Sequence, residues 1–155
     1  MDHLDFFKLQ AKNLYRDWKT HTETDDGIYE YNPQFFDVDD FLLYFEEDLD
    51  EKRFSLQRAQ HLVAKLAGFD KWNDLIKADE QHLELAKIVF NGCAHSGSIS
   101  WSRENWDMYY NGEGIVDLPI SSQIEEAKYY FTEVDPPPSD GMVMVFSGIA
   151  DGRCY

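Results

Sequence analysis

Twelve carboxylates and seven aromatic side chains crowd into residues 20–51, a segment that contains neither lysine nor arginine. Like charges at this density repel one another at low ionic strength and destabilise a fold unless something offsets them. A surface of this kind favours a basic protein partner, because complementary charge speeds association and aromatic side chains anchor interfaces. The alternative is a solvated acidic face over an aromatic core. The carboxylates predicted to bind the partner are Asp39, Asp40, Glu46, Glu47, Asp48, Asp50 and Glu51.

The same carboxylates are candidates for two other kinds of chemistry. Oxygen ligands from Asp37, Asp39 and Asp40, or from residues 46–51, suit calcium or magnesium, but the calcium-loop pattern with a central glycine and a terminal glutamate is absent. A catalytic acid/base pair needs two carboxylates isolated in a cleft, and nothing in the sequence isolates two of them. We therefore expect no metal ion, no cofactor and no catalytic residue.

A second candidate site lies near Cys93 and His95, which form the only local Cys/His pair. Zinc sites usually have two such pairs, and a catalytic Cys/His dyad would need a distant histidine without a local signature. The phosphate-binding loops and the nucleophile elbow of hydrolases are absent. If the protein is a small enzyme or ligand-binding domain instead, we expect a pocket between its N-terminal helices and its C-terminal part. The residues predicted to line that pocket are His82, Cys93, His95, Trp101 and Trp106.

Helical periodicity predicts the elements that would position both candidate sites. Apolar side chains recur at helical spacing in five stretches, residues 5–20, 38–47, 56–67, 71–78 and 79–91. Asp37 stands where an N-cap would begin the second helix, and Gly92 stands where a glycine would end the fifth. Residues 20–26 are predicted as a polar linker and residues 28–31 as a short extended piece.

The third helix carries its own start and stop signals. Ser55 precedes the apolar stripe, where its hydroxyl can accept a backbone N–H. Gly68 follows the stripe, and glycine adopts the left-handed conformation of a helix end without a Cβ clash. Phe69 is placed to fold back on this helix, and Asp70 is predicted to cap the next one. The sequence therefore predicts a helix–glycine–helix corner.

The residues of this corner also carry a resemblance to a known family. The pattern falls on Ser55, Ala59, Leu62, Val63, Ala64, Gly68, Phe69, Trp72, Asn73 and Leu75, with Lys65 where the family has arginine. It resembles the short helical module found at the N-terminus of bacterial glyoxalase-superfamily-related proteins and beside ankyrin repeats. The resemblance covers about residues 5–78 and implies a helical element with no chemistry of its own. By association it implies an accessory role in an operon-encoded system; glyoxalase activity is not implied, because no metal-binding glyoxalase pattern follows.

Beyond Gly92, glycine, serine and asparagine become more frequent and the periodicity weakens. Residues 101–110 are expected to form a helical turn. Ser122 and Glu125 fit a capping box, which predicts a helix with Ile124, Ala127, Phe131 and Val134 inward. Three prolines at 136–138 would end that helix, and residues 142–146 are a strand candidate. We therefore predict a mainly α fold: a compact bundle of about five helices over residues 1–91 with a small α+β extension over residues 92–155.

The overall charge limits the class of partner. A formal net charge of −16 disfavours nucleic acids and anionic membranes, whose phosphates are contacted by lysine and arginine. The N-terminus lacks a secretory signal, and no apolar run is long enough to span a membrane. Cys93 and Cys154 are typical of reduced thiols, although a disulfide between them stays open. We expect a cytosolic, non-enzymatic binding module resembling an immunity protein, an antitoxin or an inhibitor, and the oligomeric state is not predicted.

Overall fold

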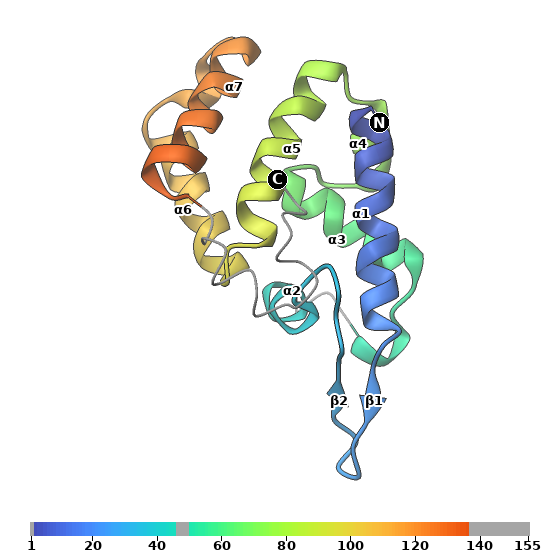
Figure 1. Ribbon diagram of the computed structural model, residues 1–155. Coiled ribbons are helices and arrows are strands. Elements are labelled where there is room, and N and C mark those ends of the chain that lie inside the picture. Colours follow the sequence, from blue (N-terminus) through green and yellow to red (C-terminus); the bar gives the residue numbers. More distant parts are fainter. Residues whose placement is uncertain (1, 46–49, 137–155) are drawn as a thin grey trace.

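The computed structural model describes residues 2–45 and 50–136, which are mainly helical (Figure 1). The α-helices are α1 (His3–Trp18), α2 (Val38–Tyr44), α3 (Leu56–Ala67), α4 (Trp72–Lys77), α5 (Glu80–Ala94), α6 (Ile99–Gly112) and α7 (Ile120–Tyr129). Shorter elements are the strands β1 (Thr22–Glu23) and β2 (Tyr29–Glu30), the 3₁₀ turns η2 (Glu51–Arg53) and η3 (Ile115–Asp117), and the π-helical turn η4 (Tyr130–Val134). The prediction of a mainly α fold is confirmed.

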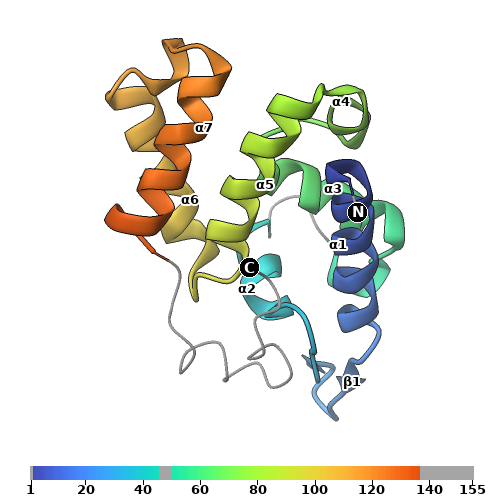
Figure 2. The ribbon, with the colours of Figure 1, turned by 45° about the horizontal axis from the view of Figure 1, so that its top comes forward.

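Helix α5 runs through the middle of the fold. Helices α1 and α3 pack against one side of it, and α6 and α7 pack against the other (Figures 1 and 2). The largest fully buried side chains come from several of these helices and include Phe7 and Leu14 of α1, Leu62 of α3 and Phe90 of α5. Between residues 92 and 136 the described elements are helices joined by short turns, and none of them is a strand. The strand predicted at residues 142–146 lies outside the described residues, as does Cys154.

In the helix–glycine–helix corner, both ends of α3 form as predicted. Ser55 accepts the backbone N–H of Arg58, and Gly68 adopts a φ of +106° at the C-terminal end of α3. The N–H of Phe69 then donates to the carbonyl of Ala64 at 2.9 Å, which closes the helix end. The prediction for Asp70 is wrong, because α4 begins one residue later than expected and its N-cap position is Lys71, which makes no side-chain capping bond.

Gly92 does not end a helix, contrary to prediction. It lies buried inside α5, which continues to Ala94, so the predicted boundary at residue 91 falls within this helix. A Cβ atom at position 92 would stand only 2.2 Å from Cδ1 of Phe131. Glycine is required here because η4 approaches the α5 backbone closely, and not because the chain turns.

The C-terminal helices differ from prediction in their extent. Residues 101–110 belong to a full helix, α6, whose N-cap Ser98 accepts the N–H of Trp101. Helix α7 begins after Pro119, so Ser122 lies within its first turn and the predicted capping box is wrong. Of the four side chains predicted to point inward, Val134 is 49% exposed, whereas the other three are buried.

The predicted polar linker and extended piece form a hairpin. Strands β1 and β2 pair antiparallel, with Thr22 opposite Glu30 and Glu23 opposite Tyr29. The hairpin projects away from the helices at the end of α1 (Figure 1). Both residues of β1 and Glu30 of β2 are exposed, whereas Tyr29 is half-buried and its ring stacks on that of His21 at 4.1 Å.

Candidate functional site

Four of the seven carboxylates predicted to bind a partner belong to the described residues, namely Asp39, Asp40, Asp50 and Glu51. The other three, Glu46, Glu47 and Asp48, lie outside the described residues. Asp39 and Asp50 are exposed, as expected. Asp40 and Glu51 are half-buried, which corrects the prediction that they are free surface charges.

Two of these carboxylates hold local structure together. Oδ2 of Asp40 accepts the backbone N–H of Ile99 at 3.0 Å, a bond that joins α2 to the first turn of α6. Oδ1 of Asp50 accepts the N–H of Lys52 at 3.0 Å, and its Oδ2 lies 3.4 Å from Nε of Arg53. Asp40 is therefore a contact between elements, and Asp50 begins the turn η2.

Negatively charged carboxylates lie close to one another around Tyr31. The Tyr31 hydroxyl donates to the carboxylate of Glu51, and burial together with Glu51 and Asp39 raises the pKa of this tyrosine. The pKa of Asp39 is raised by burial first, and then by the charges of Asp37 and Glu51. A cation brought to this place by a partner would relieve the repulsion.

The β1–β2 hairpin extends this negative surface. Its exposed carboxylates are Glu23, Asp25, Asp26 and Glu30, and beside them Ile28 is 60% exposed. Lys52 lies near the hairpin with its ammonium 5.9 Å from the ring centroid of Tyr29. These four carboxylates are absent from the predicted set, although the Asp-Asp-Gly turn of the sequence marks an exposed loop tip.

Asp17 anchors the backbone on which the acidic segment is built, and sequence reasoning missed it. Its buried carboxylate accepts the N–H groups of Gln34, Phe35 and Phe36 at 2.9, 2.7 and 2.8 Å. Burial raises the pKa of Asp17, and the three hydrogen bonds oppose that rise. The available signal was its position three residues after Leu14, on the buried stripe of α1.

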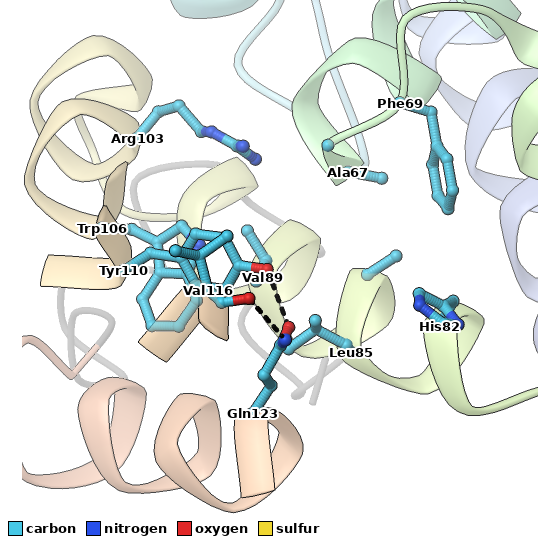
Figure 3. A pocket seen from close by; sticks show the side chains of 12 residues that line it. Ala67, Phe69, His82, Leu85, Val89, Arg103, Trp106, Tyr110, Val116 and Gln123 are labelled. Atoms are coloured by element: carbon cyan, nitrogen blue, oxygen red, sulfur yellow. Dashed lines mark hydrogen bonds between the residues drawn. The ribbon is translucent and has the colours of Figure 1, made fainter. Parts of the chain in front are cut away.

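A cavity of about 360 Å³ opens between the end of α3, helix α5 and the α6–α7 side of the fold (Figure 3). Two of the five residues predicted to line such a pocket, His82 and Trp106, line this cavity. The other three, Cys93, His95 and Trp101, do not. The cavity walls also include residues that the sequence did not predict to line a pocket, among them Phe69, Leu85, Val89, Arg103, Tyr110 and Gln123.

The three remaining residues of the predicted pocket are placed elsewhere by packing. Cys93 is fully buried, and its sulfur accepts the hydroxyl of Ser102 at 3.5 Å. Burial raises the pKa of Cys93 to about 11, so the thiol stays protonated and is a poor nucleophile. His95 is buried and stacks on Phe36 at 5.1 Å, whereas Trp101 is 65% exposed.

The main polar group of the cavity wall is Arg103, whose side chain is only 14% exposed. Its Nε and Nη2 lie 3.3 and 3.1 Å from the two oxygens of Asp107, and its Nη1 donates to the carbonyl of Leu66 near the end of α3. Gln123 of α7 accepts the hydroxyl of Tyr110 of α6 at 2.7 Å (Figure 3). The positive charge of Arg103 at the cavity is therefore balanced by Asp107 on the same helix.

Two further features concern the described residues as a set. Nowhere in this part of the chain do three or more His, Cys, Asp or Glu side chains gather closely enough to hold a metal ion. Among the helices described, none combines the length and the apolar character needed to cross a membrane.

Comparison with known proteins gave no relative. No family model, no curated protein and no solved structure matches the chain. The resemblance of the Gly68 corner to the glyoxalase-related helical module therefore stays a prediction.

Proposed function

We propose that this protein is a cytosolic, non-enzymatic module that binds a basic protein partner, in the manner of an immunity protein, an antitoxin or an inhibitor. The binding region is the acidic surface, which we define by its exposed carboxylates Glu23, Asp25, Asp26, Glu30, Asp39 and Asp50. The observation that carries the proposal is the hairpin, which projects from the helices and presents four of these carboxylates (Figure 1).

The electrostatics of the acidic surface support a basic partner. Burial raises the pKa of Asp39, and the charges of Asp37 and Glu51 raise it further, so this ionised carboxylate costs the folded protein some stability. Lysine or arginine side chains of a partner would offset this repulsion on binding and would speed the encounter. Ile28 offers an exposed apolar contact in the same hairpin.

The test is a charge-neutralised hairpin, with Glu23→Gln, Asp25→Asn, Asp26→Asn and Glu30→Gln combined. The matched control makes the same change in net charge on the α6–η4 side, with Glu104→Gln, Glu113→Gln, Asp117→Asn and Glu133→Gln, all at exposed positions. Partners are captured from native lysate, identified, purified and titrated against each variant at low and high salt.

We expect the hairpin variant to bind the partner at least about tenfold more weakly, with a shallower salt dependence. The control should bind like the unchanged protein. Equal losses in both variants would mean that only net charge matters. A hairpin variant that binds normally would overturn the proposal.

A further inference from the structure

The cavity beside α5 is large enough for a small ligand, and both apolar and polar side chains line it. Its volume of about 360 Å³ lies in the range of small-molecule sites. Trp106 and Tyr110 lie on the α6 wall, and Phe69 lies on the opposite side (Figure 3). Leu85 and Val89 of α5 complete the apolar lining. A flat aromatic ring suits these walls, because aromatic side chains favour stacked or edge contacts with another ring.

Arg103 gives the cavity a directional polar group. A guanidinium has five N–H donors, and the contacts of Arg103 within the described residues are those with Asp107 and Leu66. Figure 3 shows its head reaching across from α6 towards Ala67. The guanidinium lies beside Gly68, where a Cβ atom would stand at van der Waals distance, 3.7 Å, from Nη2. The group therefore retains donors for one hydrogen-bond acceptor of a ligand.

The charge balance decides what kind of acceptor fits. Asp107 already neutralises Arg103, and both its oxygens are engaged with the guanidinium. A ligand carboxylate would place a second anion beside Asp107, whose charge Arg103 already balances, and the repulsion between the two carboxylates would weaken its binding. A neutral carbonyl or ring nitrogen would accept from Arg103 without adding charge.

We infer that the cavity binds a small uncharged aromatic molecule that carries one hydrogen-bond acceptor, such as an aromatic amide or a nitrogen heterocycle. The ring lies between Phe69 and the α6 aromatics, and the acceptor meets Arg103. This site is separate from the acidic surface, so it goes beyond the proposed partner binding and stands or falls without it.

A pair of probes of matched shape tests the inference on the full chain. Naphthalene-2-carboxamide and naphthalene-2-carboxylate are titrated by calorimetry, and the site is mapped from the NMR shift of the Trp106 indole N–H. We expect the amide to bind and to move the Trp106 signal, and the carboxylate to bind at least about tenfold more weakly. Failure of both to bind, or tighter binding of the carboxylate, would overturn the inference.

Two variants locate the binding. Leu85→Trp fills the cavity from α5 and should abolish amide binding, whereas Leu43→Trp, at an exposed position of α2, should leave it unchanged. Arg103→Lys keeps the charge but loses the planar fork, so it should weaken amide binding and narrow the preference over the carboxylate. Thermal unfolding confirms that each variant is folded. A folded Leu85→Trp protein that binds the amide like the unchanged chain would contradict the proposed site.

Discussion

On the acidic surface, burial raises the pKa of Asp39, and the negative charges of Asp37 and Glu51 raise it further. At the cavity, the carboxylate of Asp107 is instead paired with Arg103 on the same helix, four residues away. The first region carries a surplus of negative charge, and the second holds a balanced ion pair beside the cavity.

The difference separates the two regions by the range of their interactions. An exposed surplus of charge acts over about 10 Å at roughly 0.1 M salt and over shorter distances as ionic strength rises. A neutral wall acts through contact and hydrogen bonds, which salt affects little. Partner binding at the acidic surface should therefore depend strongly on salt, and ligand binding in the cavity should not.

The largest expected effect concerns the anchor of the acidic segment. Asp17→Ala removes the acceptor of three backbone N–H groups and should lower the free energy of unfolding by about 3 kcal/mol or more. Asp17→Asn should cost less, because the amide keeps one acceptor oxygen. Urea denaturation measures both, with Asp70→Ala at an exposed position as the control. A loss for Asp17→Ala no greater than the control would show that the segment is held in another way.

The next effect concerns the contact that holds η4 against α5. Gly92→Ala places a Cβ atom 2.2 Å from Phe131 and should lower the free energy of unfolding by about 1–3 kcal/mol. Gly112→Ala in α6 meets nothing within 4 Å and should be neutral or slightly stabilising, since alanine favours helix. Thermal and urea unfolding measure the change in stability that each of these two substitutions causes. Combining Gly92→Ala with Phe131→Leu should recover part of the loss; a stabilising Gly92→Ala would contradict the close approach.

A smaller effect is the pH dependence of the acidic surface. Because the pKa of Asp39 is raised in the folded state, its protonation favours folding. That contribution is complete below the unfolded pKa of about 3.9 and is lost as pH rises through the folded pKa. Asp39→Asn should therefore be more stable than the unchanged chain at pH 7, by less than about 1 kcal/mol, and the difference should vanish in acid.

Asp79 provides a comparison of opposite sign for the pH experiment. Hydrogen bonds from the backbone and ring of His82 lower the pKa of this exposed carboxyl. Its stabilising contribution is present above the unfolded pKa and is lost as pH falls through the folded one. Asp79→Asn should lose stability at neutral pH and approach the unchanged chain in acid. If stability changed with pH in the same direction for Asp39→Asn and Asp79→Asn, the electrostatic difference between their surroundings would be contradicted.

The smallest effect is the salt dependence of stability itself. The charge-neutralised hairpin should unfold at a slightly higher temperature than the unchanged chain at low salt, because exposed like charges repel only weakly. The difference should disappear at roughly 1 M salt, where screening acts within about 3 Å. Amide binding in the cavity should stay constant over the same range, and a marked salt dependence there would mean that the cavity carries net charge.

Start and stop signals that act within one turn were predictable. Asp37 caps α2, Ser55 caps α3 and Gly68 ends α3, as expected from sequence. Asp70 and Ser122 failed as caps because Lys71 stands at the N-cap position of α4 and Pro119 at that of α7, and neither makes a side-chain capping bond. The start of a helix is therefore predicted only to within a few residues.

For the candidate sites, the sequence could locate the segment rich in carboxylates, but it could not show which carboxylates are exposed and which contact other segments. Asp40 is held by Ile99, which is 59 residues away along the chain. Arg103 joins the cavity wall through Leu66, which belongs to another helix. Neither contact leaves a signal in local spacing, so Asp40 was predicted as exposed and Arg103 was not singled out.

By itself, the sequence determined the mainly helical fold, the corner at Gly68 and the strong negative charge, since periodicity, capping and composition act within a few residues. Only the tertiary structure decided that Gly92 serves a contact with Phe131, that Asp17 holds residues 34–36 and that Cys93 and Trp106 lie in different surroundings. The physical reason is distance along the chain: burial and charge balance depend on segments that meet only after the helices pack.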